Sequence, residues 1–374
     1  MNTLKYPFIL LTICIMALAT SSCSNSDRRN EDGVNLMGSA KMLHVEQRDG
    51  YRVATIVSAR DSNTVEAAYI LVDRNVELPD SLPQGIVLRT PLDNVAVFAS
   101  VFAGAFEELG CIDAVKGVVD KDYFKQPAII AGLKNGKVAD LGPSSGPSTE
   151  LLTALHPQAI IMNIYEGMDV KGIDKTGIPI IKIADNLEKD PLARAEWIRF
   201  LGMLTGTESK ADSIFSSVKA EYLRLKGKAS LYESRPRVLT DNMYQGVWYV
   251  PGGASFQARL IEDAGGDYIW KDDRSTGSLN LSYEEVLAKA HDADIWMLKL
   301  FGVKDLDRDA LCGMDQRYKN FKCLIKGNVY YSDTEESTLF EDLPFHPDKV
   351  LADYIALFHP ESGIALKYFL KIKK

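Results

Sequence analysis

A long amphipathic segment, residues 207–228, constrains the possible folds of this chain more than any other feature. Its apolar side chains recur at steps of three and four residues, which is the spacing of one helix face: Ala211, Ile214, Phe215, Val218, Tyr222 and Leu225. A helix of about 22 residues extends over about 33 Å, which is long enough to join two separate lobes. Because a single rigid helix would connect the lobes, we expect them to move little against each other.

Short apolar runs alternate with helical sequence on both sides of this segment. Strands are predicted over residues 85–90, 115–120, 159–163, 178–183, 237–240, 293–298 and 328–332, and helices over 94–109, 190–206, 255–264, 282–290 and 347–358. Such alternation is typical of βα units with mostly parallel sheets. The predicted fold is therefore α/β, with two lobes of mostly parallel sheets joined by a single long backbone helix. Ligands collect beyond the carboxyl ends of parallel strands, which places the expected ligand cleft between the lobes.

Residues 41–84 have a different pattern, in which alternating β segments follow one another around an Asp49-Gly50 turn signal. We expect a β-rich N-terminal extension that precedes the main fold, and the sequence does not indicate its role. The predicted domain boundaries are a β-rich extension over 41–84, an N-terminal α/β lobe over 85–206, a connecting helix over 207–228 and a C-terminal α/β lobe over 229–374.

The first 22 residues have the layout of a bacterial lipoprotein signal peptide. Lys5 precedes a short apolar run, and the small residues Ser21 and Ser22 precede Cys23. This layout predicts cleavage after residue 22, a lipid on Cys23 and a polar tether over 23–40; a plain secretory signal is the alternative. The apolar run is shorter than the ~20 residues of a membrane-spanning helix. We therefore expect an envelope protein that faces the periplasm and is held at the membrane only by its lipid.

Composition and cysteine placement narrow the function classes. A formal net charge of −8 argues against nucleic-acid binding, and we expect a monomer. In an oxidising compartment Cys312 and Cys323 would form a disulfide, with two unpaired thiols as the alternative. The sequence has no Gly-x-Ser-x-Gly elbow, no Walker loop and no Gly-x-Gly-x-x-Gly motif after a strand. A binding protein is therefore favoured over an enzyme, with an exported hydrolase as the alternative from another class.

Four segments, over residues 147–161, 255–266, 281–287 and 328–331, together resemble the helical-backbone (class III) periplasmic substrate-binding proteins of ABC importers for iron–siderophore complexes, haem and vitamin B12. The resemblance covers most of residues 85–360, and the β-rich extension departs from it. The family docks on a dimeric permease through one carboxylate on each lobe, and the matching positions are Glu150 and Glu262. The alternative for each is an ordinary solvated glutamate.

The resemblance implies that the cargo is a metal chelate or corrinoid, and aromatic residues near strand ends are candidates to hold it. The ligand-binding candidates are Tyr123, Tyr165, Tyr244, Trp248, Tyr249 and Arg274. For Trp248 and Tyr249 the alternative is a place in the sheet core, and for Arg274 it is the solvated surface. No histidine follows a predicted strand end, so we expect no protein-bound metal and no cofactor; any iron or cobalt would belong to the cargo.

The expected function is that of a lipid-anchored substrate-binding protein delivering an iron–siderophore complex, haem or a corrinoid to an ABC importer. A scavenging or sensing lipoprotein without a permease is the alternative among binding proteins. If the cargo is haem, a tyrosine (Tyr123, Tyr165 or Tyr249) would be the candidate axial ligand. The sequence does not choose among the three kinds of cargo.

Overall fold

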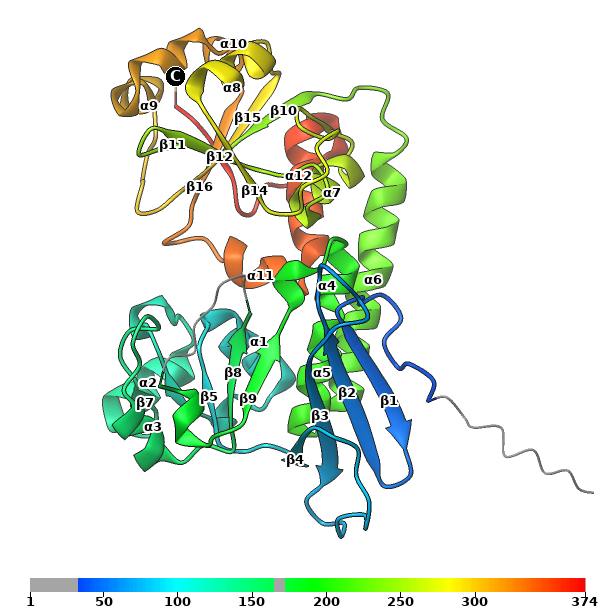
Figure 1. Ribbon diagram of the computed structural model, residues 1–374. Helices are drawn as coiled ribbons and strands as arrows, with labels where there is room; N and C mark the ends of the chain where they lie inside the picture. Colours follow the sequence, from blue (N-terminus) through cyan, green and yellow to red (C-terminus); the bar gives the residue numbers. More distant parts are fainter. Residues whose placement is uncertain (1–32, 165–171, 374) are drawn as a thin grey trace, which may run out of the picture. The chain divides into compact units, whose positions relative to one another are not determined.

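The computed structural model describes residues 33–164 and 172–373. The predicted signal peptide, Cys23 and Tyr165 lie outside the described residues. Asn35–Lys374 form one compact unit, which contains an N-terminal sheet and two α/β lobes in chain order (Figure 1). None of the helices among the described residues is long and apolar enough to cross a membrane.

The β-rich extension is a four-stranded sheet in the order β1-β2-β3-β4. Its strands are β1 (Leu43–Arg48), β2 (Tyr51–Val57), β3 (Val65–Asp73) and β4 (Ile86–Thr90). The first three are antiparallel, and Gly50 supplies the positive φ of the β1–β2 turn. β4 pairs with β3 in parallel. The expectation that 85–90 opens the first lobe's sheet is therefore wrong, because this apolar run instead completes the N-terminal sheet.

The first lobe contains a five-stranded parallel sheet in the order β7-β6-β5-β8-β9. Its strands are β5 (Val95–Val97), β6 (Val115–Val118), β7 (Ala139–Asp140), β8 (Ala159–Asn163) and β9 (Ile180–Ile183), and its helices are α1 (Ser100–Leu109), α2 (Pro127–Asn135), α3 (Thr149–Leu155), α4 (Pro191–Ala195) and α5 (Trp197–Thr205). Residues 95–97, predicted as helix, form the central strand because all three side chains are fully buried between the layers. The helix predicted from Asp190 is interrupted at Glu196.

The predicted connector is present as α6 (Glu208–Ala229). The amino-terminal half of this helix places Ala211, Phe215 and Val218 in the first lobe's core. The carboxyl-terminal half places Tyr222 and Leu225 in the second lobe's core. One continuous helix therefore contributes to both hydrophobic cores.

The second lobe has a main sheet in the order β13-β10-β15-β16-β17, in which only β17 is antiparallel, and a small antiparallel sheet in the order β11-β12-β14. The strands are β10 (Arg237–Thr240), β11 (Met243–Tyr244), β12 (Val247–Pro251), β13 (Asp267–Tyr268), β14 (Ser278–Leu281), β15 (Ile295–Leu300), β16 (Val329–Asp333) and β17 (Leu370–Lys371); the helices are α7 (Phe256–Asp263), α8 (Tyr283–Ala290), α9 (Arg308–Met314), α10 (Lys322–Lys326), α11 (Leu339–Phe345) and α12 (Pro347–Phe358). Two α/β lobes with mostly parallel sheets and one long connecting helix confirm the predicted fold class.

Two buried glutamates fasten the N-terminal extension to the first lobe. Glu196 accepts hydrogen bonds from the backbone N–H groups of residues 38–40 at 2.6–2.9 Å. Glu188 accepts from the backbone of residues 41–42 and from the indole N–H of Trp197. The last part of the predicted 23–40 tether is therefore not free chain, because residues 38–40 are bound to the end of α4.

Candidate ligand-binding site

A cavity of about 300 Å³ opens at the carboxyl ends of β10 and β15 in the second lobe. Asp241, the first residue after β10, pairs with Lys299 near the end of β15 at 3.0 Å. The Lys299 ammonium also donates to the side-chain oxygen of Gln257 at 3.0 Å. Both charged side chains are 19% exposed. The polar floor of the cavity is thus an ion pair whose two members come from adjacent parallel strands.

Two glycines allow the other walls of this cavity to approach closely. A Cβ on Gly252 would lie 2.2 Å from the carbonyl oxygen of Ser275, and one on Gly253 would lie 2.3 Å from that of Trp270. These clashes mean that only glycine fits between β12 and the loop over residues 270–277. The turn leads directly into α7, whose N-cap Ser255 accepts from the backbone N–H of Ala258 at 3.2 Å. As a result the start of α7, the end of β12 and residues 276–278 line one cavity.

Aromatic side chains are exposed near these strand ends. The exposed aromatic rings among residues 33–164 and 172–373 are Tyr123, Tyr244, Tyr249, Phe301 and Phe340. They lie on segments that follow β6, β10, β15 and β16, and Tyr249 lines the cavity. Tyr249 therefore offers flat apolar area to a ligand in the cavity, while the other four rings lie outside its lining.

The first lobe reaches this cavity through a buried polar chain. Asp185, 1% exposed and just beyond β9, accepts from Asn163 at 2.6 Å and from Arg194 at 2.8 Å. The Arg194 guanidinium in turn lies 4.5 Å from the ring centre of Phe256 at the start of α7, a cation–π distance. The carboxyl ends of β8 and β9 are therefore connected to a wall of the second-lobe cavity.

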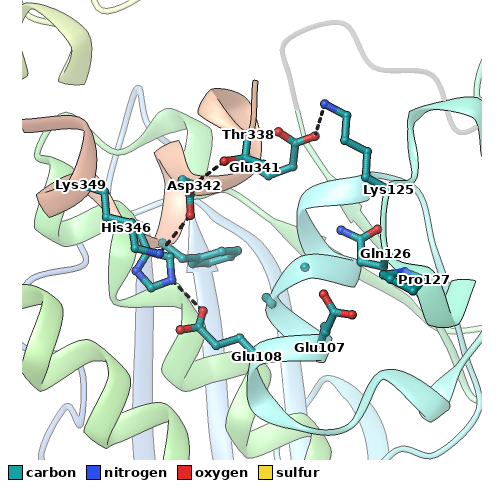
Figure 2. A pocket seen from close by; sticks show the side chains of 13 residues that line it. Glu107, Glu108, Lys125, Gln126, Pro127, Thr338, Glu341, Asp342, His346 and Lys349 are labelled. Atoms are coloured by element: carbon teal, nitrogen blue, oxygen red, sulfur yellow. Dashed lines mark hydrogen bonds and ion pairs between the residues drawn. The ribbon is translucent and has the colours of Figure 1, made fainter. Parts of the chain in front are cut away.

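A second contact joins the lobes at the other strand ends. Lys125, which follows β6, donates to the carbonyl oxygen of Ser337 at 3.1 Å, and both Ser337 and Glu341 follow β16. Figure 2 shows the Lys125 ammonium facing the Glu341 carboxylate, 3.7 Å away. Together with the Arg194–Phe256 contact, this shows that the carboxyl ends of the two main sheets border the same region of the molecule.

A further cavity of about 330 Å³ flanks the Lys125–Glu341 contact and is lined by α1, the start of α2, α11 and α12. Figure 2 shows His346 and Glu108 facing each other here, with Nε2 and Oε2 2.7 Å apart. Burial acts to raise the pKa of Glu108, but the hydrogen bond and charge of His346 outweigh it and hold this pKa below its usual value. Burial also acts to raise the pKa of Asp342, yet hydrogen bonds from Lys367 and Tyr368 lower it to about 2. These polar groups bind one another and connect the lobes.

Two buried polar atoms at the end of β16 have no hydrogen-bond partner among the described residues. They are the Ser332 hydroxyl and one carboxylate oxygen, Oδ2, of Asp333. The other oxygen of Asp333 accepts from the backbone N–H groups of Gly302 and Glu335 at 2.9 and 3.0 Å. Because an unpaired buried polar atom costs free energy, this strand end has unused hydrogen-bonding capacity.

The predicted ligand residues have different places in the structure. Tyr249 lines the cavity, while Tyr123 and Tyr244 are exposed outside its lining. Arg274 is exposed on the loop before β14 and lines none of the cavities described above. The ligand-binding roles of these four residues stay predictions.

The prediction that Trp248 contacts ligand is wrong. Its side chain is fully buried, and its indole N–H donates to the carbonyl oxygen of Thr240 at 3.0 Å. The ring stacks on Trp296 with the ring centres 5.6 Å apart. Side chains alternate along β12, so Trp248 faces the core and its neighbour Tyr249 faces outward.

The remaining predicted positions are the cysteines and the docking glutamates. Cys312 and Cys323 are free thiols in the structure, contrary to the expected disulfide. Cys323 is fully buried in the second lobe's core with Cys312 packed against that core, and burial raises the pKa of Cys323 to about 12. Glu150 in the first turn of α3 and Glu262 in α7 are both exposed. Their docking role stays a prediction.

Sequence reasoning missed four residues that build the site: Asp185, Arg194, Phe256 and Gln257. Asp185 follows a strand end, so the rule that selected the other candidates would have found it. Phe256 and Gln257 lie in the first turn of α7 and Arg194 lies in the last turn of α4, and these positions gave no comparable signal. Within residues 33–164 and 172–373, no three His, Cys, Asp or Glu side chains converge in a way that could hold a metal ion.

Known proteins resemble this chain in both sequence and structure. An uncharacterized lipoprotein of Methanocaldococcus jannaschii is 29% identical over 304 residues, covering 76% of this chain and 70% of the relative. The iron(3+)-hydroxamate-binding protein of Bacillus subtilis is 30% identical over 158 residues, covering 41% and 42% of the two chains. The periplasmic heme-binding protein of Pseudomonas aeruginosa has the same fold, with a TM-score of 0.59 at 18% identity over 75% of this chain and 98% of its own.

The family model described as periplasmic binding protein matches residues 95–335. This span begins at the first strand of the first lobe and ends just after β16, so it contains both main sheets and the helix between them. The N-terminal sheet lies outside it, including β4, which falls within the residues 85–360 over which the sequence resembles the family. The chain therefore belongs to the periplasmic binding protein family, and its long α6 gives it the helical-backbone form of that fold.

Proposed function

We propose that this protein is a lipid-anchored, periplasm-facing substrate-binding protein that delivers an iron complex, a siderophore or haem, to an ABC importer. The observation that carries the proposal is the cavity at the strand ends of the second lobe, lined by the exposed ring of Tyr249 and connected to the first lobe through Arg194. The names of the Bacillus subtilis and Pseudomonas aeruginosa proteins support an iron-containing cargo. A corrinoid is the third candidate.

The site is suited to recognising a bulky chelate without reacting with it. Tyr249 and Phe256 offer flat apolar area beside the cavity, and the amide of Gln257 and the Asp241–Lys299 pair offer hydrogen bonds at its floor. The remaining lining adds hydroxyl groups from Ser255, Thr276 and Ser278, so the wall is mostly polar and can orient a ligand that carries several hydrogen-bonding groups. The contact between Arg194 and Phe256 holds this wall against the first lobe.

The direct test is a titration of the full chain, purified in detergent, with ferric siderophores, haemin and cyanocobalamin. Binding is followed by visible absorbance and by quenching of tryptophan fluorescence. The proposal expects saturable, sub-micromolar binding of an iron complex. Saturable binding of cyanocobalamin alone would replace iron by a corrinoid, and failure of all three classes to bind would reject the proposal.

Delivery to a permease is tested separately from binding. Glu150 and Glu262 are exposed, one on each lobe, and each would pair with a cation on a transporter subunit. Replacing both by arginine should abolish uptake of the radiolabelled cargo while leaving its affinity unchanged. The matched control is Glu233→Arg at an exposed carboxylate before β10. Full uptake by the double variant would favour a scavenging protein that does not use these docking residues.

Anchoring is tested at Cys23. Cys23→Ser removes the thiol that would carry the lipid and should move the protein from the membrane to the soluble fraction. Retention of this variant at the membrane would show that attachment does not depend on the lipid.

A further inference from the structure

The turn between α11 and α12 is a joint at which the second lobe is held against the first. Phe345, the last residue of α11, is 3% exposed and packs in the first lobe's core. The next residue, His346, extends its imidazole to Glu108 on α1, with Nε2 and Oε2 2.7 Å apart (Figure 2). Apolar burial and a polar bond together hold this joint, and a proton can change the polar bond.

Carboxylates lie on both sides of the His346 ring. Glu108 belongs to the first lobe, and Asp348, in the first turn of α12, places its Oδ1 atom 3.9 Å from Nδ1 of the ring. This Oδ1 atom is buried and has no hydrogen-bond partner among the described residues. A neutral imidazole carries one N–H and an imidazolium carries two. Only the charged ring can therefore direct a hydrogen toward each carboxylate.

The other charged side chains around the joint have partners of their own or are exposed to solvent. They are Asp342 with Lys349 and Lys367, Glu341 with Lys125, and the exposed Glu107. Lys349 acts electrostatically on Glu108 and Asp348, but its ammonium bonds to Asp342. Within residues 33–164 and 172–373, no lysine or arginine forms an ion pair with either of these two carboxylates. The charge of His346 therefore compensates both most directly.

The cavity of about 330 Å³ beside this joint gives the pair access to water. His346 and Glu108 both line it, so a proton can reach the ring while the lobes stay in contact. With the ring charged, the bond to Glu108 is charge-assisted and roughly twice as strong as its counterpart from a neutral donor. With the ring neutral, this bond weakens and Asp348 loses its nearest positive charge.

We propose that His346 and Glu108 form a proton-controlled latch between the two lobes, tight in an acidic medium and loosened in a neutral or alkaline one. The latch goes beyond carriage of an iron complex, because it sets how readily the lobes part whatever the cargo is. It rests on a bond between two residues 238 positions apart and on the buried carboxylate behind the ring.

Hydrogen exchange followed by mass spectrometry tests the latch on the full chain in detergent. Exchange is measured at pH 5.5 and pH 8.0, on either side of the range in which histidine titrates, and corrected for the intrinsic pH dependence of amide exchange. We expect the amides of α1 and α11 to be about three- to ten-fold better protected at the lower pH. The helices α3 and α8, one in each lobe, serve as internal references. Equal protection of α1 and α11 at both pH values, or a change shared equally by all four helices, overturns the proposal.

Two variants separate the proton from the packing of the joint. His346→Gln keeps an N–H that can donate to Glu108 but does not titrate, and Glu108→Gln keeps an acceptor for the ring but removes the charge. In both, the protection of α1 and α11 should no longer depend on pH. His291→Gln is the matched control, because it removes an exposed imidazole from the same lobe and should keep the original response. A response that persists in both variants, or that the control loses equally, would contradict the latch.

Discussion

Two buried acidic regions of this protein differ in how completely their oxygens are paired. At the junction between the N-terminal sheet and α4, both oxygens of Glu188 and of Glu196 accept hydrogen bonds, mostly from the backbone of residues 38–42. At the end of β16, Asp333 has one oxygen paired and one without a partner among the described residues. The difference indicates that every acceptor oxygen of the first region contributes to stability, while one acceptor oxygen of the second is buried without a hydrogen bond.

The largest expected effect is at the junction. Glu196→Ala leaves three buried or half-buried backbone N–H groups without an acceptor and removes a partner of Arg199, so the free energy of unfolding should fall by about 3–5 kcal/mol. Urea denaturation measures this change. If the junction is purely structural, the affinity for ligand stays within about two-fold of the original value.

The control for this change is Glu208→Ala, which removes a carboxylate that is 42% exposed and pairs with Arg52. An exposed ion pair of this kind contributes at most about 1 kcal/mol. A ligand affinity that falls with Glu196→Ala but not with Glu208→Ala would break the comparison, since it would give the N-terminal sheet a part in binding.

The next largest effect concerns the alternation of buried and exposed side chains along β12. Tyr249→Ala should weaken binding of the cargo about ten-fold with little change in stability, because this ring is 42% exposed and lines the cavity. Trp248→Phe should do the reverse and lower stability by about 1–2 kcal/mol, since it removes a buried indole hydrogen bond. Affinity and urea unfolding are measured on both variants. Loss of affinity in Trp248→Phe alone would reverse our assignment of the two faces.

His359, whose Nδ1 lies 3.7 Å from the exposed carboxylate of Glu361, extends the comparison to a buried group away from the strand ends. Both of its ring nitrogens lack a hydrogen-bond partner in the described chain, and the ring stacks on Tyr232 at a centroid distance of 4.1 Å. Burial lowers the pKa of His359 from its ordinary value of 6.5, so below that pH the unfolded chain binds the proton more readily than the folded protein. Its stabilising contribution is complete above pH 6.5 and should be lost as the pH falls below it.

The pH dependence is measured as the urea midpoint of the original protein and of His359→Gln between about pH 7.5 and pH 5. The variant should show a shallower loss of stability toward acid. Parallel curves for the two proteins would show that the unpaired imidazole does not drive the acid sensitivity.

The smallest effect is expected for Lys125→Ala. Lys125 is 37% exposed and lies 3.7 Å from Glu341, so its removal should lower the free energy of unfolding by about 0.5 kcal/mol or less. Its hydrogen bond to Ser337 also joins the two lobes, so the ligand off-rate is measured on the same variant by stopped-flow fluorescence. A fall in the free energy of unfolding as large as that of Glu196→Ala would show that this inter-lobe contact contributes as much to stability as the junction between the N-terminal sheet and α4.

Local sequence patterns predicted much of the fold. The predicted bounds of β8, β10 and α12 match the structure. Each is an apolar run or a periodic segment that is flanked at both ends by residues that end strands or helices. The run over 85–90 was also correctly predicted as a strand but was assigned to the wrong sheet. Its partner, β3, lies earlier in the chain, and strand pairing depends on three-dimensional register that a five-residue run does not contain.

The site was predicted only in part, for the same reason. Asp241 and Lys299 lie at strand ends, where ligand residues are expected. Their pairing, however, depends on β10 and β15 being neighbours, although 58 positions separate the two residues. The error at Trp248 was avoidable, since a strand of alternating burial places two adjacent aromatic residues on opposite faces. The contact of Arg194 with Phe256 joins two lobes and had no local signal.

The long helix α6 has a consequence for how the protein unfolds. Phe215 and Val218 belong to the core of the first lobe and Tyr222 and Leu225 to that of the second, within one uninterrupted helix. Unfolding of either lobe would expose the apolar side chains of its half of the helix to water, and the loss of helix there would destabilise the other half. Calorimetry should therefore record one cooperative heat-absorption peak, and a ligand held by either lobe would raise the melting temperature of both.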